Sequence, residues 1–244
     1  MAALQRLFRA VYPPQCVSCG CVVGEEGGLC GSCWRDTPFI SGTVCDLCGV
    51  PLPGDQAEPG DPDLVCDDCL AAARPWSKGR SALLYEGAGR RMVLSLKHGD
   101  RTESAPVLAA WMHRVAQPLL APEMLVAPVP LHWLRLMRRR FNQSALLSQS
   151  VSKAMNLAHC PDLLIRNRAT PTQEGRGRDA RFTNVSAAIS VNPMRKHRLI
   201  GRKILLVDDV MTSGATFAAS AEACLAAGAS DVRVLALARV AKAP

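Results

Sequence analysis

The chain has 244 residues, of which 48% are hydrophobic, with 29 Lys and Arg against 21 Asp and Glu and a net charge of +8. This length fits one or two domains, and the hydrophobic content excludes a disordered chain. No apolar run approaches the roughly 20 residues of a transmembrane helix, and the first residues lack the apolar core of a secretory signal. We therefore expect a cytoplasmic protein without a membrane span.

Charge and cysteine divide the chain into two unlike segments. Residues 1–70 carry three arginines against ten acidic residues, a net −7, which leaves +15 for residues 71–244. Nine of the eleven cysteines also fall in the first of these segments. We predict a cysteine-rich domain over residues 1–75 and a second domain over residues 76–244.

Four Cys-x-x-Cys pairs occupy the first segment. Two thiolates separated by two residues can hold one zinc ion from a single tight turn, and two such turns complete a tetrahedral site. Disulfides fit less well, because no export signal is present and cytosolic thiols stay reduced. The pattern predicts two structural zinc ions held by Cys16, Cys19, Cys30, Cys33, Cys45, Cys48, Cys66 and Cys69.

The partners of these pairs are a separate question. Sequential pairing, the first pair with the second and the third with the fourth, is our expectation, and interleaved pairing is the alternative because spacing alone does not set partners. Cys21 is interpreted as a spare thiol, with replacement of Cys19 as the alternative.

From Trp76 onward, short apolar runs alternate with amphipathic stretches. Strands are predicted over residues 82–86, 125–129, 187–191, 203–208 and 232–238, and helices over residues 105–117, 144–158 and 216–227. Gly228 is placed to end the last helix. Such alternation favours an α/β domain with a mostly parallel sheet. Gly87-Ala-Gly89 and Gly175-Arg-Gly177 are not read as dinucleotide fingerprints, because neither shows a strand followed by a helix.

The most informative run covers residues 204–216. A buried strand carries Asp208 and Asp209 at its carboxyl end, where α/β sheets place ligands. A turn and the start of a helix follow, and the backbone N–H groups there form an anion site. Carboxylates beside such a site suit a sugar phosphate. The turn consists of Thr212, Ser213, Gly214, Ala215 and Thr216.

This run resembles the signature of type I phosphoribosyltransferases, which bind 5-phosphoribosyl 1-diphosphate (PRPP) with Mg²⁺. The resemblance implies that Asp208 and Asp209 contact the 2′- and 3′-hydroxyls of the ribose. It also implies that the Thr212–Thr216 turn holds the 5′-phosphate, in a type I phosphoribosyltransferase fold.

Further motifs make the chain similar to the ComF family of competence proteins, in which a double zinc ribbon precedes such a domain. They are Leu96-Lys97-His98-Gly99-Asp100, Val126-Ala-Pro128-Val-Pro130 and the run from Arg139 to Gln143. Arg140 stands where the family usually has Gly. The resemblance implies a pyrophosphate loop with Arg135, Arg139 and Arg140, and a flexible loop with Gln173, Arg181 and Asn184.

The family resemblance also implies a role in handling imported single-stranded DNA, with a competence helicase as a partner. Whether the chain is an active phosphoribosyltransferase stays open, because the sequence indicates neither a general base nor an acceptor. One alternative is a DNA- or helicase-binding module that uses the PRPP site only as a sensor. The other is a nucleotide-salvage phosphoribosyltransferase.

Overall fold

The computed structural model describes residues 12–54, 64–98, 101–131, 137, 141–167 and 188–241. None of the helices in these ranges is long and apolar enough to cross a membrane. The helices are α2 (Gly31–Asp36), α3 (Asp67–Leu70), α4 (Gly87–His98), α5 (Ala105–Val115), α7 (Gln143–Met155) and α9 (Ala215–Ala226). Three 3₁₀ helices are η1 (Thr102–Ser104), η2 (Gln117–Leu119) and η3 (Pro193–Arg198).

Within the described ranges, seven strands form two sheets. They are β1 (Lys78–Leu84), β2 (Leu125–Pro128), β3 (Ala158–His159), β4 (Leu164–Arg166), β5 (Ile189–Val191), β6 (Lys203–Met211) and β7 (Asp231–Arg239). The main sheet has the order β1-β7-β6-β2-β3, and each of its neighbouring pairs is parallel. Strands β4 and β5 form a separate antiparallel pair. The predicted α/β class with a mostly parallel sheet is confirmed.

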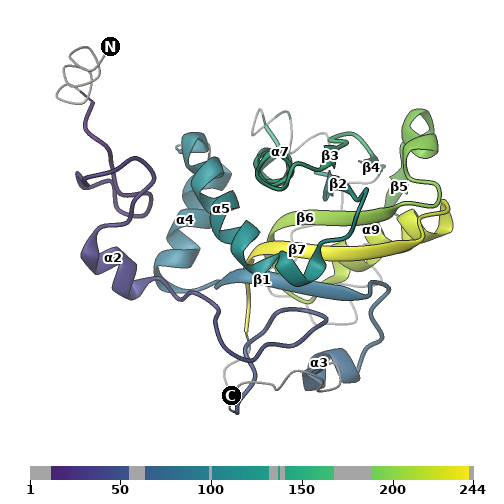
Figure 1. Cartoon of the computed structure of the whole chain (residues 1–244), viewed down its shortest axis with the longest axis horizontal. Helices are drawn as coiled ribbons and strands as arrows, with labels where there is room; N and C mark the ends of the chain where they lie inside the picture. Colours follow the sequence, from purple (N-terminus) through teal and green to yellow (C-terminus); the bar gives the residue numbers. More distant parts are fainter. Residues whose placement is uncertain are drawn as a thin grey trace.

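Both faces of the main sheet are covered (Figure 1), which explains the nearly continuous apolar runs of its strands. Leu205 and Val207 of β6 pack into the core beneath helices α4, α5 and α7. Ile204 and Leu206 face the opposite core, which contains α9 and three buried cysteines of the N-terminal segment. The cysteine-rich segment therefore supplies part of one covering layer.

Backbone hydrogen bonds join this segment to the edge strand β1. Ile40 donates its N–H to the carbonyl of Ala82 at 3.0 Å, and Gly79 donates to the carbonyl of Asp46 at 2.7 Å. The guanidinium of Arg80 also forms an ion pair with the carboxylate of Asp46. The cysteine-rich segment thus shields the edge of the sheet that β1 would otherwise expose.

Several predicted boundaries differ from the structure. The first strand begins at Lys78 rather than at residue 82, because it pairs with β7 from Lys78 onward. The helix predicted to reach residue 158 ends at Met155, since Asn156 has a left-handed φ of 52° and Ala158 already pairs with Leu125. The predicted end at Gly228 fits, because this glycine follows the C-cap of α9 with a φ of 106°.

The interpretation of Gly87-Ala-Gly89 was wrong on one point. Helix α4 begins at Gly87, directly after strand β1, so the strand-then-helix context is present. The third glycine of a dinucleotide fingerprint is replaced by Met92, which is buried in the core. Gly89 serves close packing instead, because a Cβ there would lie 2.5 Å from the carbonyl oxygen of Leu84.

The contact between Gly79 and the loop of the third cysteine pair gives a stability prediction. A Cβ at Gly79 would lie 2.3 Å from the carbonyl oxygen of Leu47 and 2.8 Å from Val234 Cγ2. We expect Gly79→Ala to lower the free energy of unfolding by about 1–3 kcal/mol, as overpacking does. Urea denaturation measures this change. Gly24→Ala is the control, since apart from its chain neighbours no described residue has an atom within 4 Å of its Cβ position. Equal losses in both variants would contradict the prediction.

Candidate functional site

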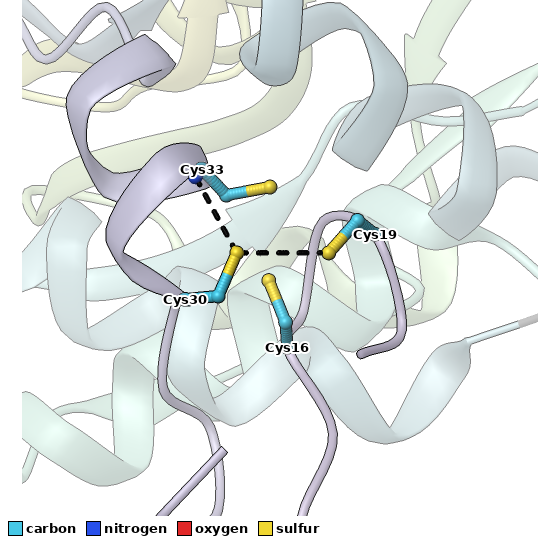
Figure 2. Close-up of side chains that lie close together, drawn as sticks. All are labelled: Cys16, Cys19, Cys30 and Cys33. Atoms are coloured by element: carbon cyan, nitrogen blue, oxygen red, sulfur yellow. Dashed lines mark hydrogen bonds between the residues drawn. The ribbon is translucent and has the colours of Figure 1, made fainter. Parts of the chain in front are cut away.

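The first cysteine site consists of Cys16, Cys19, Cys30 and Cys33, whose sulfur atoms all lie within 4.8 Å of one another. Figure 2 shows the four side chains pointing toward a common centre, two from a turn and two from the start of α2. The Sγ atoms of Cys19 and Cys30 are 3.7 Å apart. A tetrahedral ion with Zn–S bonds of about 2.3 Å requires sulfurs about 3.8 Å apart. The donor set therefore fits zinc.

The second cysteine site consists of Cys45, Cys48, Cys66 and Cys69 and is the more deeply buried of the two. Its sulfurs also lie within 4.8 Å, with 3.7 Å between Cys48 and Cys66. Side-chain hydrogen bonds from Cys48 and Cys69 lower the pKa of the Cys45 thiol. The same hydrogen bond with Cys45 raises the pKa of the Cys48 thiol. Four sulfurs this close cannot all ionise without a cation, and zinc would supply it.

These two clusters confirm sequential pairing of the Cys-x-x-Cys turns. All eleven cysteines lie in the described part of the chain and form no disulfide there, in agreement with metal sites rather than with the disulfide alternative. Cys21 is exposed and belongs to neither group of four, in agreement with a spare thiol. Cys160 and Cys224 are buried in the core of the sheet.

A pair of carboxylates lies near the end of the central strand β6. Asp208 Oδ1 accepts hydrogen bonds from Ser144 Oγ at 2.7 Å and from the N–H of Asp209 at 2.8 Å. Asp209 is 5% exposed, and its Oδ2 lies 3.4 Å from Lys97 Nζ. Although this distance makes an ion pair, the buried Oδ2 has no hydrogen-bond donor within the described residues. Asp208 thus accepts a hydrogen bond from a hydroxyl, whereas Oδ2 of Asp209 accepts none from the described residues.

The two acids perturb each other. Burial, followed by the charge of Asp209, raises the pKa of Asp208 to about 7, and the hydrogen bond from Ser144 opposes this rise. A carboxyl group with such a pKa gains from a ligand that donates hydrogen bonds or brings positive charge.

The Thr212–Thr216 turn follows the acids and leads into α9. Gly214 caps the helix with a left-handed φ of 84°, and Ser213 Oγ accepts a hydrogen bond from the N–H of Ala215 at 3.4 Å. The buried guanidinium of Arg239 donates to the carbonyls of Met211 and Thr212. The turn carbonyls therefore point toward arginine, and the first amides of α9 have no intrahelical acceptor. This arrangement suits an anion.

Some of the predicted site residues lie in the described part of the chain, and the others lie outside it. The acids and the Thr212–Thr216 turn lie together where β6 meets α9, and the eight cysteines form two clusters. The arginines and polar residues of the two predicted loops fall outside the described residues: Arg135, Arg139, Arg140, Gln173, Arg181 and Asn184.

Sequence reasoning missed four residues that contact this site. Lys97 and Ser144 contact the acids, and Arg74 and Arg239 contact the carbonyls of the turn or of the residue before it. Lys97 lies in the Leu96–Asp100 motif, and Ser144 follows the run that ends at Gln143, so both had a local signal. Arg74 and Arg239 had none, because single arginines are common at surfaces.

The cysteine clusters predict a metal content that elemental analysis can measure. We expect about two zinc ions per chain, and about one in each of the variants Cys30→Ser and Cys66→Ser, because three thiolates hold zinc far less tightly than four. Cys21→Ser is the matched control and should retain both ions, since Cys21 is not one of the four clustered cysteines although its side chain contacts Cys19 and Cys30. Fewer than about one equivalent in the wild-type protein would contradict the assignment.

The raised pKa of Asp208 predicts a pH-dependent stability. The folded state binds this proton more tightly than the unfolded state, so its contribution to stability falls as pH rises from about 4 through about 7. Asp208→Asn removes the charge and keeps an oxygen for Ser144. We expect this variant to exceed wild type by about 1–2 kcal/mol at pH 8, with a smaller difference at pH 5.

Urea denaturation at the two pH values tests this expectation. Asp36→Asn is the control, because Asp36 is exposed and away from the acid pair. A gain in stability at pH 5 as large as that at pH 8 would show that the Asp208 charge is not its cause.

Comparison with known proteins supports the N-terminal assignment first. The family described as "Double zinc ribbon domain" matches residues 7–78, which include all eight clustered cysteines. Two solved structures overlap only in part, the B. subtilis glutamine phosphoribosylpyrophosphate amidotransferase and the Trypanosoma cruzi hypoxanthine phosphoribosyl transferase. The first is 18% identical with a TM-score of 0.34 and covers 56% of this chain and 26% of that chain. The second is 10% identical with a TM-score of 0.34, and the match covers 59% of this chain and 66% of that chain.

The relatives by sequence extend over almost the whole chain. "DNA utilization protein YhgH" of Escherichia coli K12 is 32% identical over 219 residues, which are 87% of this chain and 90% of the relative. "Competence protein F" of Haemophilus influenzae is 27% identical over 232 residues, which are 92% of this chain and 96% of the relative. Together with the double zinc ribbon, the parallel sheet and the acid-and-turn run, these relatives show that the chain belongs to the ComF family, in which a zinc ribbon precedes a phosphoribosyltransferase-type domain.

Proposed function

We propose that this chain binds PRPP·Mg²⁺ at the end of β6 and serves the use of imported DNA. The observation that carries the first part is the buried Oδ2 of Asp209, which has no hydrogen-bond donor within the described residues. A buried acceptor without a donor is costly, and a ribose hydroxyl would supply one. Ser144 already satisfies part of Asp208, so the two carboxylates can accept from neighbouring hydroxyls of one ribose.

The Thr212–Thr216 turn would hold the 5′-phosphate of the same ligand. The start of α9 offers amide donors and a favourable dipole, and the hydroxyls of Thr212, Ser213 and Thr216 add donors. Lys97 balances the charge of Asp209 beside the ribose position. Ribose and phosphate would thus be recognised by consecutive residues of one strand–turn–helix unit.

The chemistry open to such a site is displacement at C1 of the ribose. The bond from C1 to pyrophosphate breaks with its electron pair leaving on the pyrophosphate, and an acceptor nucleophile forms the new bond to C1. Arg135, Arg139 and Arg140 would stabilise the departing pyrophosphate in this proposal, since guanidinium groups bind phosphate oxygens in pairs. The acids would fix the ribose while positive charge develops at C1.

The link to DNA rests on the relatives, whose printed names are "DNA utilization protein" and "Competence protein F". We propose that the +15 segment contacts single-stranded DNA during this use, and that the acidic zinc ribbon docks a protein partner such as a helicase. A phosphate backbone binds clustered Lys and Arg and is repelled by the ribbon's net negative charge.

Calorimetric titration of the zinc-loaded protein with PRPP·Mg²⁺ tests the ligand. We expect binding in the wild type and an affinity lower by about a hundredfold or more in Asp208→Asn/Asp209→Asn, because two charge-assisted hydrogen bonds are lost. The control is Asp231→Asn at the start of β7, where Asp231 pairs with Arg233 at the opposite end of the parallel sheet. Absence of binding in the wild type would refute the ligand assignment.

The same double variant separates an active site from a module that only binds DNA. If the PRPP site is required, transformation of cells with linear DNA should fall with the loss of PRPP binding, while binding of a single-stranded oligonucleotide is retained. Undiminished transformation would favour the DNA-binding module. Release of pyrophosphate from PRPP with a free purine or pyrimidine base as the only acceptor would favour a salvage transferase.

A further inference from the structure

The second cysteine site lies beside the Thr212–Thr216 turn, whereas the first does not. Cys45, Cys48 and Cys69 share a core with Met211 and Phe217, the residues on either side of the turn. The first site lies on the other side of the sheet, where aromatic contacts connect Trp34 through Phe39 to Trp111 of α5. The two metal sites therefore differ in what they support.

One guanidinium connects the second cysteine site to the turn. Arg74 donates from Nε to the sulfur of Cys69 at 3.4 Å and from Nη1 to the carbonyl of Ser213 at 2.9 Å. In a zinc site the Cys69 sulfur would be a thiolate, and a charged donor to a ligating atom fixes both groups. Arg74 thus connects the fourth cysteine pair to the backbone of the Thr212–Thr216 turn.

A second connection runs through the third cysteine pair. Trp76 Nε1 donates to the carbonyl of Leu47, between Cys45 and Cys48, at 2.6 Å. The Trp76 ring lies 5.4 Å from the Arg74 guanidinium carbon and packs against Phe217 in the first turn of α9, with ring centroids 6.2 Å apart. Both turns of the metal site therefore contact the strand–turn–helix unit.

The side chains of Arg74 and Trp76 also lie next to Gly214 in the turn. A Cβ at Gly214 would lie 3.0 Å from Arg74 Nη1 and 3.1 Å from a ring carbon of Trp76. The left-handed φ of 84° at Gly214 aims the following amides along α9. Gly214 is thus in contact with the same two side chains that bind the second cysteine site.

We propose that the second cysteine site is a brace for the anion-binding turn, with Arg74 as its positioning residue, so that metal loss there weakens phosphate binding at the turn. The phosphate part rests on the proposed function, whereas the bracing of the turn does not. Without metal, the Cys69 thiol is a weaker acceptor for Arg74, and the four cysteines no longer share one centre. The ligand class is a phosphate monoester such as the 5′-phosphate of PRPP.

Hydrogen exchange of the ligand-free, full-length protein tests the brace by itself. We expect the amides of residues 212–218 to lose at least about tenfold of their protection in Arg74→Ala and in Cys66→Ser. Arg101→Ala is the matched control, because Arg101 donates to the carbonyl of Cys16 at 2.7 Å in the first site. Unchanged protection of the turn in Arg74→Ala would overturn the proposal whatever the ligand, including when Cys66→Ser fails to fold.

Calorimetry with PRPP·Mg²⁺ then tests the coupling. Arg74→Ala and Cys66→Ser should each weaken binding by about tenfold, within the usual range of coupling between sites. The variant with both substitutions should bind no more weakly than Cys66→Ser alone, since loss of the metal already breaks the connection through Arg74. Cys30→Ser should weaken binding less than Cys66→Ser, although each loses one zinc.

Arg74→Lys separates positioning from direct contact with phosphate. Lysine keeps the charge but cannot donate to Cys69 and Ser213 from one planar group, so its affinity should match that of Arg74→Ala. Rescue by lysine, or additive losses in the double variant, would overturn the positioning role. A turn that loosens as expected in a protein that does not bind PRPP would support the brace and refute only the proposed ligand.

Discussion

Two adjacent carboxylates on the central strand of a doubly covered sheet are the constraint on which the site depends. Strand β6 is the central strand of the sheet, paired with β7 and, as far as Val207, with β2, so Asp208 and Asp209 follow directly on a segment paired on both sides. Burying them is unfavourable, as the raised pKa of Asp208 shows. Helix α7 supplies a hydroxyl from Ser144 and helix α4 an ammonium from Lys97, and these contacts offset part of that cost.

The zinc ribbon is integrated with the sheet. Its third and fourth cysteine pairs pack on the face of the sheet that α9 also covers, and Trp76 and Phe217 meet in that layer. Clusters of four thiolates with zinc carry a net negative charge, which explains why Arg74 lies against Cys69. The division into residues 1–75 and 76–244 stays a prediction, and buried residues of both segments share one core that includes Met211 and Phe217 on either side of the Thr212–Thr216 turn.

Local patterns predicted much of the fold and of the site. The spacing of the cysteines predicted two metal sites, although it left interleaved pairing open until the structure showed sequential pairing. Apolar runs predicted the strands β2, β6 and β7 within a few residues. Helix α4 was missed, because its two glycines and two arginines conceal the apolar positions Met92, Val93 and Leu96. Its helical form depends on burying those three side chains against the sheet.

The sequence by itself determined which reactive groups this protein carries: four Cys-x-x-Cys pairs, and two adjacent carboxylates followed by the Thr212–Thr216 turn. These features lie within short stretches, where residue spacing is enough to bring the groups together. Only the tertiary structure decided what surrounds them, since Ser144 is 64 residues from Asp208 and Arg74 is 139 residues from Ser213. Contacts over such separations follow from the order of strands and the packing of both faces of the sheet, which no local pattern encodes.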